Sequence, residues 1–346
     1  MKNNKNKAIT IAGVDIEPGK HAIVKLPLAD LYTQTEMSIP IHIFHGKSAG
    51  PKVFISSVIH GDEINSVEIV RRVHAQRWLK HINGTLITLP IINVYGFMLR
   101  SRYLPDRRDL NRSFPGSQSG SLAARLANTL TTEIFSHCQY GIDLHTGAYG
   151  RINFPQLRVN LSTPGTKKLA KAFDAPVIID AQLRDGSLRQ VASEMNIPIL
   201  VYEGGEALRF NELCIRMGVR GITKVLDYLG MIESPLLSKA TLLKPLITKH
   251  TRWVRACDSG MLQFCKDFTK KFAVKKGETL AYIHDPFQVN PPQKIKAPFN
   301  GVVIGLTNLP VVNEGDAVFN IASTQRLKTL DAYIDDMRDE ITQFDS

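Results

Sequence analysis

The sequence has few cysteines and no long apolar run, and both shortages narrow the class of protein. Its 346 residues include four cysteines, none in a CxxC pair, and four thiols in a chain this long do not make a disulfide framework. No stretch of about 18 apolar residues is free of charge, which argues against a membrane span. The basic first 20 residues lack the apolar stretch of a signal peptide. We therefore expect a cytoplasmic protein with no membrane partner.

Dense runs of Lys and Arg interleaved with aromatic residues are also missing. The formal net charge is +11, which suits nucleic acid, a membrane surface or an acidic small substrate without choosing among them. In the absence of an aromatic-rich basic patch we expect no nucleic-acid partner. The composition, with 43% apolar and 22% charged residues, is typical of a well-cored protein, and the length favours two domains.

Between residue 51 and about residue 229, apolar strand patterns alternate with helical patterns. We expect strands at 53–59, 85–94, 141–144 and 198–202 and helices at 66–79 and 122–135. This alternation is typical of an α/β protein with a mixed sheet flanked by helices. Short β segments in residues 1–50, such as 39–44, are expected to pair with an edge or precede the main sheet. The pattern predicts a first domain over residues 1–245.

From about residue 248 the pattern changes to short strands with Gly, Pro and Asn turns. A weak repeat is present, because Ala256-x-x-x-Gly260 recurs as Ala297-x-x-x-Gly301. Repeated hairpins predict a small all-β barrel or sandwich over residues 246–325. Such domains resemble the biotinyl/lipoyl carrier fold, but no exposed lysine lies between matched methionines, so we expect a structural or substrate-covering module. The apolar spacing in 326–346 predicts an amphipathic C-terminal helix.

Three residues near predicted strand ends form a candidate metal site. His60 and Glu63 lie three apart in a turn between a buried strand and a helix, and imidazole nitrogen and carboxylate oxygen are both good zinc donors. His145 ends another predicted strand, at the edge of the sheet where α/β enzymes gather their site residues. Asp143 is placed to accept a hydrogen bond from a ligand histidine. The pair alone is a weak signal, but the strand-turn-helix context and the second histidine favour a metal.

The functions of two further segments can each be interpreted in two ways. Residues 102–116 contain four arginines among turn residues, which suits either carboxylate recognition by guanidinium forks or a basic solvated loop. Glu203 follows a short apolar strand and precedes two glycines. It is placed either as a general base for metal-bound water or as a solvated glutamate beside a turn. Glu206 is its nearest competitor, and spacing does not decide between them.

The combination and order of four motifs resemble the succinylglutamate desuccinylase/aspartoacylase family, relatives of the zinc carboxypeptidases. The motifs are HGDE at 60–63, DLNRSFPG at 109–116, DLHTG at 143–147 and the E-x-G that begins at Glu203. The resemblance runs from about residue 40 to about residue 325. One departure is Asn-Val-Tyr-Gly at 93–96, where the family often has Asn-Pro.

The resemblance implies a metal centre with one zinc ion per chain. His60, Glu63 and His145 match the zinc ligands, and Glu203 matches the catalytic glutamate. Asp109 is expected to hold the arginine loop in shape. In this way the resemblance favours Glu203 over Glu206 as the base.

The same resemblance implies roles for the arginines. Arg102 matches an arginine that polarises the scissile carbonyl, and Asn111 and Arg112 match the pair that binds the substrate carboxylate. The stretch that contains Arg151 and Arg158 is similar to a pattern in less well studied deacylase-like members, which adds two candidate substrate-binding residues.

The expected reaction is therefore hydrolysis of the amide bond of a small, carboxylate-bearing N-acyl amino acid. The acyl group, the amino acid, the native metal and a homo-oligomeric state are left open by the sequence. One alternative is a zinc carboxypeptidase that acts on a short peptide C-terminus. An alternative from another class is a non-catalytic carboxylate-binding protein on the same fold.

Overall fold

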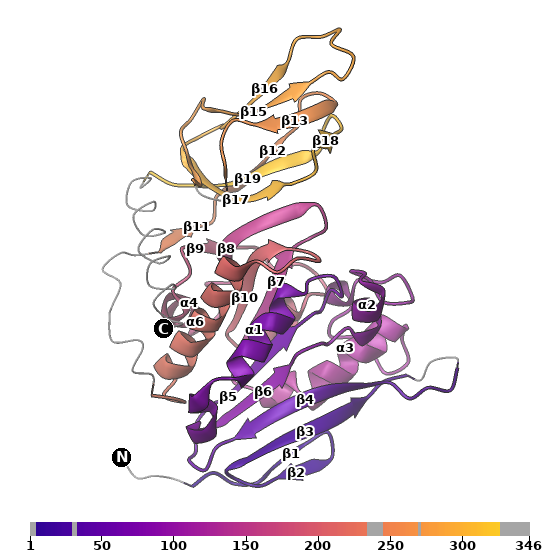
Figure 1. Cartoon of the computed structure of the whole chain (residues 1–346). Coiled ribbons are helices and arrows are strands. Elements are labelled where there is room, and N and C mark those ends of the chain that lie inside the picture. Colours follow the sequence, from indigo (N-terminus) through magenta and orange to yellow (C-terminus); the bar gives the residue numbers. More distant parts are fainter. Residues whose placement is uncertain (1–4, 30–32, 234–244, 269–270, 326–346) are drawn as a thin grey trace.

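A computed structural model describes residues 5–29, 33–233, 245–268 and 271–325. Within them a mixed thirteen-stranded sheet runs through the molecule, in the order β12-β19-β17-β8-β10-β7-β5-β6-β4-β3 along its main path (Figure 1). Three further strands, β9, β11 and β14, pair beside this path. The strands are β3 (Lys20–Pro27), β4 (Ser38–His45), β5 (Lys52–Ser57), β6 (Thr85–Leu89), β7 (Tyr140–Gly147), β8 (Arg151–Val159), β9 (Val177–Asp180), β10 (Ile199–Glu206), β11 (Leu246–Thr248), β12 (Thr251–Arg255), β14 (Ala273–Val274), β17 (Gly301–Thr307) and β19 (Ala317–Ser323).

Helices cover both faces of the central strands, which confirms the predicted α/β class. Val53 and Ile55 of β5 belong to the apolar core on one face, and Phe54 belongs to the core on the other. Such apolar residues on both faces are typical of parallel strands covered twice. The first face carries α1 (Asn65–His74), α4 (Thr166–Phe173) and α6 (Glu212–Tyr228), and the second carries α3 (Leu122–Glu133) and α5 (Leu188–Glu194).

Several predicted boundaries were wrong by a few residues. The helix predicted at 66–79 is α1, which ends at His74 and is followed by a 3-10 helix at Arg77–His81. The strand predicted at 85–94 ends at Leu89, because Pro90 has no N–H to continue the ladder. The chain then turns into α2 (Val94–Leu99), and α3 stops at Glu133 rather than at residue 135.

The first part of the chain forms the far edge of the sheet, which is one of the two placements expected for it. β3 and β4 pair antiparallel, and β4 pairs with β6. A separate hairpin of β1 (Ile9–Ile11) and β2 (Val14–Ile16) adds its two buried isoleucines to the core that α3 covers.

The C-terminal strands form an antiparallel sandwich, which confirms the smaller all-β module. Strands β12, β19 and β17 form one layer, and the order β16-β15-β13-β18 forms the other. The second layer consists of β13 (Gly260–Phe264), β15 (Thr279–His284), β16 (Gln293–Lys296) and β18 (Val311–Val312). The sequence did not predict that β17 pairs with β8, which joins the sandwich to the main sheet.

Some predictions about organisation stay predictions. The domain boundary predicted at residue 245 is one of them. Strand β11 follows this boundary directly, yet it pairs with β9 of the main sheet. The helix predicted at 326–346 lies outside the described residues. Across the described part of the chain, no helix has the length and apolar character needed to cross a membrane.

Three histidines from different elements gather beside the N-terminal edge of the sheet. The imidazole of His74 on α1 lies with its ring centroid 4.5 Å from that of His42, and its Nε2 is 2.7 Å from Oγ1 of Thr88. His21 Nε2 lies 3.3 Å from His42 Nδ1. Burial lowers the pKa of His74 to about 4, and the charges of His42 and His21 add to the shift.

We expect this histidine cluster to make folding sensitive to mild acid. Between about pH 6.5 and about pH 4 the unfolded chain binds a proton at His74 and the folded chain does not, so the free energy of unfolding falls as the pH falls. We expect His74→Gln to flatten this slope, because an amide does not titrate. Urea unfolding of the metal-loaded protein at several pH values measures it. The exposed His137→Gln is the control, and parallel curves for the wild type and His74→Gln would contradict the assignment.

Candidate active site and metal centre

Three neighbouring parallel strands bring the candidate residues to one edge of the sheet. β5 pairs with β7 so that Ser57 lies opposite Leu144, and β7 pairs with β10 so that His145 lies opposite Glu203. His60 follows the end of β5 within three residues. The carboxyl ends of parallel strands meet at one edge, so two histidines and a glutamate are gathered there by backbone pairing.

The turn between β5 and α1 has a tightly fixed backbone. A Cβ on Gly61 would lie 2.0 Å from the carbonyl carbon of Gly96 on α2, so only glycine fits against that helix. Asn93 caps α2 by accepting a hydrogen bond from the Gly96 N–H and also donates to the carbonyl of Ile59. Asn93 begins the Asn-Val-Tyr-Gly stretch, where the family often has Asn-Pro. It therefore holds the turn against α2 without a proline.

His60, Glu63 and His145 converge on one point. Nδ1 of His60 is 2.6 Å from Oε1 of Glu63, and Nδ1 of His145 is 2.8 Å from its Oε2. All three side chains are buried, and one ligand atom from each lies within 4.8 Å of the other two. In the part of the chain that the structure describes, this is the only such group of three His, Cys, Asp or Glu residues.

Each histidine contacts a second carboxylate through its other ring nitrogen. His145 Nε2 is 2.8 Å from Asp143, which also accepts a hydrogen bond from the hydroxyl of Ser56 at 2.7 Å. His60 Nε2 is 3.1 Å from Asp109. This arrangement leaves both Nδ1 atoms as the donors for a metal. The sequence predicted the position of Asp143, but it missed the contact between Asp109 and His60, which are 49 residues apart.

The electrostatics of the cluster follow from burial and close opposite charges. Burial raises the pKa of the Glu63 carboxyl, but His60 and His145 outweigh it and hold the pKa well below its usual range. Burial lowers the pKa of His145, yet Asp143 and Glu63 raise it well above its usual value. Glu63 is therefore ionised, and a metal would compete with protons for the imidazole nitrogens.

The arginine loop lies against this cluster. Nη2 of Arg102 is 2.8 Å from Asp109, and its Nη1 is 3.5 Å from Glu63. The side-chain oxygen of Asn111 accepts a hydrogen bond from the N–H of Leu188 at 3.0 Å, which turns its amide nitrogen to other partners. The Arg112 guanidinium donates to the carbonyl of Asn111 and also lines the cavity.

Glu203, and not Glu206, faces the cavity. Its Oε2 accepts a hydrogen bond from the Asn153 amide at 2.6 Å, and its Oε1 lies 3.4 Å from Nε of Arg158. Glu206 instead accepts a hydrogen bond from Asn308 and is not part of the cavity wall. Asn153 is a contact of Glu203 that the sequence did not predict.

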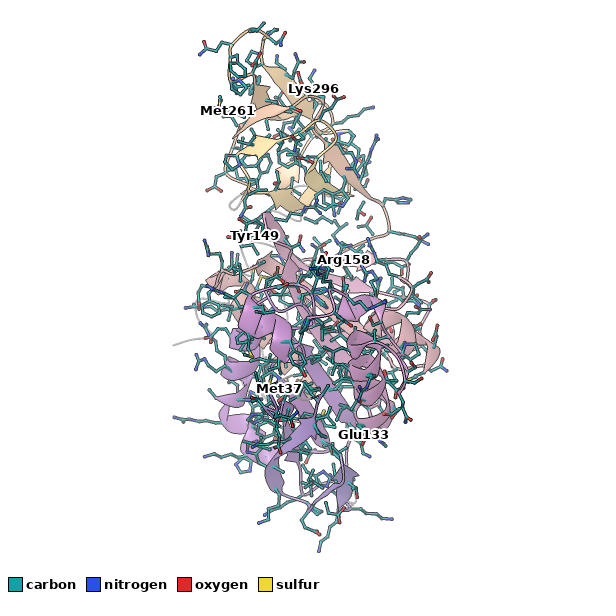
Figure 2. The ribbon with its side chains drawn as sticks, turned by 90° about the vertical axis from the view of Figure 1, so that its right-hand side faces the viewer. Met37, Glu133, Tyr149, Arg158, Met261 and Lys296 are labelled. Carbon is teal, nitrogen blue, oxygen red and sulfur yellow. The ribbon has the colours of Figure 1, made fainter. Side chains whose placement is uncertain are left out.

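A single cavity of about 1270 Å³ collects nearly all the predicted site residues. Asp109 lies behind the wall, and the predicted residues that line the cavity are His60, Glu63, Arg102, Asn111, Arg112, Asp143, His145, Arg151, Arg158 and Glu203. The C-terminal module adds Lys249, His250, Thr251 and Trp253. The Arg151 guanidinium stacks 5.0 Å from the centre of the Trp253 ring, and Arg158 lies near the junction of the two modules (Figure 2).

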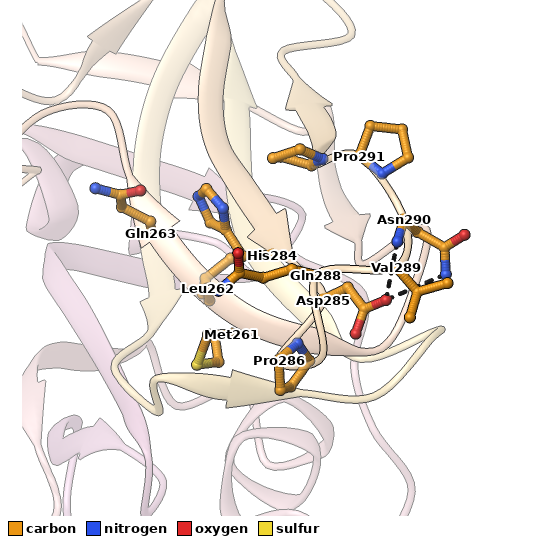
Figure 3. A pocket seen from close by; sticks show the side chains of 11 residues that line it. Met261, Leu262, Gln263, His284, Asp285, Pro286, Gln288, Val289, Asn290 and Pro291 are labelled. Atoms are coloured by element: carbon orange, nitrogen blue, oxygen red, sulfur yellow. Dashed lines mark hydrogen bonds between the residues drawn. The ribbon is translucent and has the colours of Figure 1, made fainter.

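A smaller cavity of about 630 Å³ lies on the outer layer of the sandwich (Figure 3). Met261, His284, Asp285 and a proline-rich loop line it, and Asp285 is bonded to its own loop through the N–H groups of Phe287 and Asn290. None of the predicted site residues lines it, so it is not the candidate active site.

The fold and the main cavity define an α/β protein with a His-Glu-His group at the carboxyl edge of a mixed sheet and a β-sandwich beside it. The family model described as the succinylglutamate desuccinylase/aspartoacylase catalytic domain matches residues 49–229. The chain therefore belongs to the succinylglutamate desuccinylase/aspartoacylase family, as its motifs predict.

Relatives agree with this assignment over most of the chain. An N-alpha-acetyl-L-2,4-diaminobutyric acid deacetylase of Halomonas elongata is 26% identical over 328 residues, which cover 90% of this chain and 94% of the relative. The fold is similar to a solved succinylglutamate desuccinylase/aspartoacylase from Rhodobacter sphaeroides, with a TM-score of 0.77 at 24% identity over 92% of this chain and 99% of that one. It is also similar to product-bound EutE (DoeB) from Ruegeria pomeroyi, with a TM-score of 0.75 at 22% identity over 88% and 95%.

Asp143 is expected to set the metal affinity through His145. We expect Asp143→Asn to weaken zinc binding about 10–100-fold, the usual effect of removing a carboxylate that holds a ligand histidine. Competition with a fluorescent chelator measures the dissociation constant. Asp258→Asn, at an exposed turn of the sandwich, is the control, and an unchanged constant in Asp143→Asn would contradict the role.

Gly61 is expected to be irreplaceable at the turn. An added Cβ would have to displace backbone of α2, so we expect Gly61→Ala to lose about 1–3 kcal/mol of stability through overpacking and to bind zinc more weakly. Thermal unfolding and the same chelator assay test both effects. Gly315→Ala is the control for loss of a glycine far from the site: its φ of +85° strains an alanine although no atom lies within 4 Å, so it should lose stability and keep its zinc affinity. Wild-type zinc affinity in Gly61→Ala would refute the displacement of His60 and Glu63.

Proposed function

We propose that this protein is a zinc-dependent hydrolase of the amide bond of a small N-acyl amino acid. The observation that carries the proposal is the His-Glu-His group with Glu203 in register beside it, in one cavity with Asn111 and Arg112. Family membership supports amide hydrolysis, and a relative named as an N-acetyl amino acid deacetylase supports the kind of substrate.

The donor set fits one zinc ion per chain. Two imidazole nitrogens and one carboxylate are the ligands typical of catalytic zinc, which keeps a further position for water or substrate. Asp143 and Asp109 bind the outer nitrogens of the two histidines, which fixes the orientation of the rings. The donors of His60, Glu63 and His145 are thus aimed at a shared point.

In the proposed mechanism, residues of this chain transfer the proton and orient the groups that react. A bound zinc ion supplies a Lewis acid that lowers the pKa of water and polarises the carbonyl. The carboxylate of Glu203 takes the proton of the attacking water and later gives it to the leaving nitrogen. Asn153 fixes one oxygen of Glu203, which leaves the other for proton transfer.

The arginine loop binds and polarises the substrate. Arg102, at 3.5 Å from Glu63, is close enough to the ligand cluster to stabilise the negative charge that develops on the carbonyl oxygen. Asn111 and Arg112 hold the substrate carboxylate, and this contact orients the amide. The amide nitrogen of Asn111 is the donor for this contact, because its oxygen is bonded to the N–H of Leu188.

The cavity wall favours a small substrate over a long peptide. Lys249 and Trp253 bring the β-sandwich into the wall, so the module closes part of the site, as a substrate-covering role requires. Turnover of peptides by the purified protein would instead favour a carboxypeptidase with the same metal ligands.

Glu203 is the residue whose replacement tests the mechanism. We expect Glu203→Gln to keep its zinc and to lose about 10²–10⁴-fold in rate, the usual contribution of a general base. Steady-state hydrolysis of N-acyl amino acids and metal analysis of the same sample measure both.

Glu206→Gln is the matched control. It changes the same side chain three residues away, outside the cavity, and should keep near-normal turnover. Near-normal turnover by Glu203→Gln would remove Glu203 from the mechanism.

A further inference from the structure

Asn153 lies where the main sheet meets the β-sandwich, with a glycine beside it on each neighbouring strand. It pairs with Gly205 of β10 on one side and with Gly305 of β17 on the other. A glycine inside a strand weakens the strand and marks a bulge or a close approach. Gly205 has a φ of +83°, which explains a glycine at that position. Gly305 lies outside the left-handed region, so its lack of a side chain has another cause.

That cause is the side chain of Asn153. A Cβ on Gly305 would lie 2.9 Å from Oδ1 of Asn153. The next nearest atoms belong to Ile152 and Asn320, and at 3.5 and 3.6 Å they would be in ordinary contact. The same amide donates through its Nδ2 to Oε2 of Glu203 at 2.6 Å. The amide of Asn153 therefore lies between Gly305 and Glu203, with its oxygen toward the β-sandwich and its nitrogen toward the carboxylate.

A bulge in β17 brings the glycine to this position. The register of β17 against β19 shifts after Val303, so that Ile304 is an extra residue and Gly305 follows it. In an unshifted register Ile304 would stand next to Asn153, and its branched side chain would take the space of the amide. The bulge is also held from β8, because the buried Gln156 donates through Nε2 to the carbonyl of Ile304 at 2.9 Å.

Both residues of β8 that contact this bulge are also neighbours of Glu203. Gln156 pairs directly with Glu203 across the two strands, and Asn153 binds its carboxylate. Strand β17 lies on the other side of β8 (Figure 1) and contacts the same two residues. It therefore supports the part of β8 that carries the contacts of Glu203.

We propose that the bulge of β17 at Ile304 and Gly305 positions the general base. It holds the amide of Asn153, and through this amide the carboxylate of Glu203, in the orientation that proton transfer needs. The inference rests on the proposed function, in which Glu203 is the base. It gives the β-sandwich a part in the reaction besides closing the cavity, and it makes Gly305 and Asn153 positioning residues that act through Glu203.

Gly305→Ala tests the proposal in the zinc-loaded enzyme. The added methyl meets only the end of a side chain, so we expect the variant to fold and bind zinc as the wild type does, with the Asn153 amide displaced from Glu203. A misplacement of about 1 Å can cost about 100-fold in rate, and we expect kcat to fall about 10–100-fold with KM little changed. Val303→Ala is the control, because it removes volume from the β-sandwich core one residue before the bulge. It should lower the melting temperature and leave kcat unchanged.

Two double variants show whether the effect passes through Asn153 and Glu203. Asn153→Ala lacks the atom that the new methyl would meet, so adding Gly305→Ala to it should cost no further rate. Adding Gly305→Ala to Glu203→Gln should likewise leave the residual rate unchanged, because the carboxylate that is positioned is gone. A merely structural effect of the methyl would lower the rate again in both backgrounds and would overturn the proposal.

Crystal structures of the zinc-loaded wild type and Gly305→Ala give a readout that needs no turnover. We expect the 2.6 Å contact between Asn153 and Glu203 to be lost in the variant. A retained contact, a wild-type kcat in Gly305→Ala, or an equal loss of kcat in Val303→Ala would each overturn the proposal. Near-normal turnover by Glu203→Gln would instead remove Glu203 as the base, and absence of N-acyl amino acid hydrolysis by the wild type would refute the proposed function. Either of these two results removes the positioning role as well, even where the contact is displaced.

Discussion

The arrangement of the site depends on one buried carboxylate held between two imidazoles. Glu63 is almost fully buried, and its two oxygens face His60 and His145. A buried charge is tolerated only with close and well-directed partners, so both histidines must be held in place. Asp143 and Asp109 hold the two histidines through contacts with their outer ring nitrogens. The result is an alternating chain of acids and imidazoles, and its centre is the only place within the described residues where three possible metal ligands meet.

Pairing of the strands, rather than local sequence, brings the side chains of the candidate site together. Parallel pairing of β5, β7 and β10 fixes the ligand strands and sets Glu203 opposite His145. The antiparallel partner β8 then supplies Asn153 and Arg158 to Glu203. These two residues are five apart, so in a regular strand they would point to opposite faces. A register shift between Glu203 and Gly205 adds one residue on the β8 side, which turns both side chains toward Glu203.

The sequence could predict the part of this site that is local. His60 and Glu63 share one turn, and Asp143 lies two residues from His145, so strand-end patterns and spacing were sufficient. The contact of Asp109 with His60 was not predictable, because a loop conformation closes it across 49 residues. Asn153 was missed for a different reason: its face depends on the bulge, for which Pro155, a residue confined to edges and bulges of sheets, was the available signal.

Because β17 pairs with β8, the β-sandwich lies beside the main sheet, and the two provide different parts of the cavity. Strand ends of the main sheet provide the candidate metal donors and Glu203, whereas part of the cavity wall comes from Lys249 and Trp253, outside those strands. Side chains on the wall can change without disturbing the donors, because they belong to different strands. Members of one family can therefore keep the same donors while the side chains of the wall differ. The donors limit the kind of chemistry that a site can support, and the shape and side chains of the wall limit which molecules fit beside the donors.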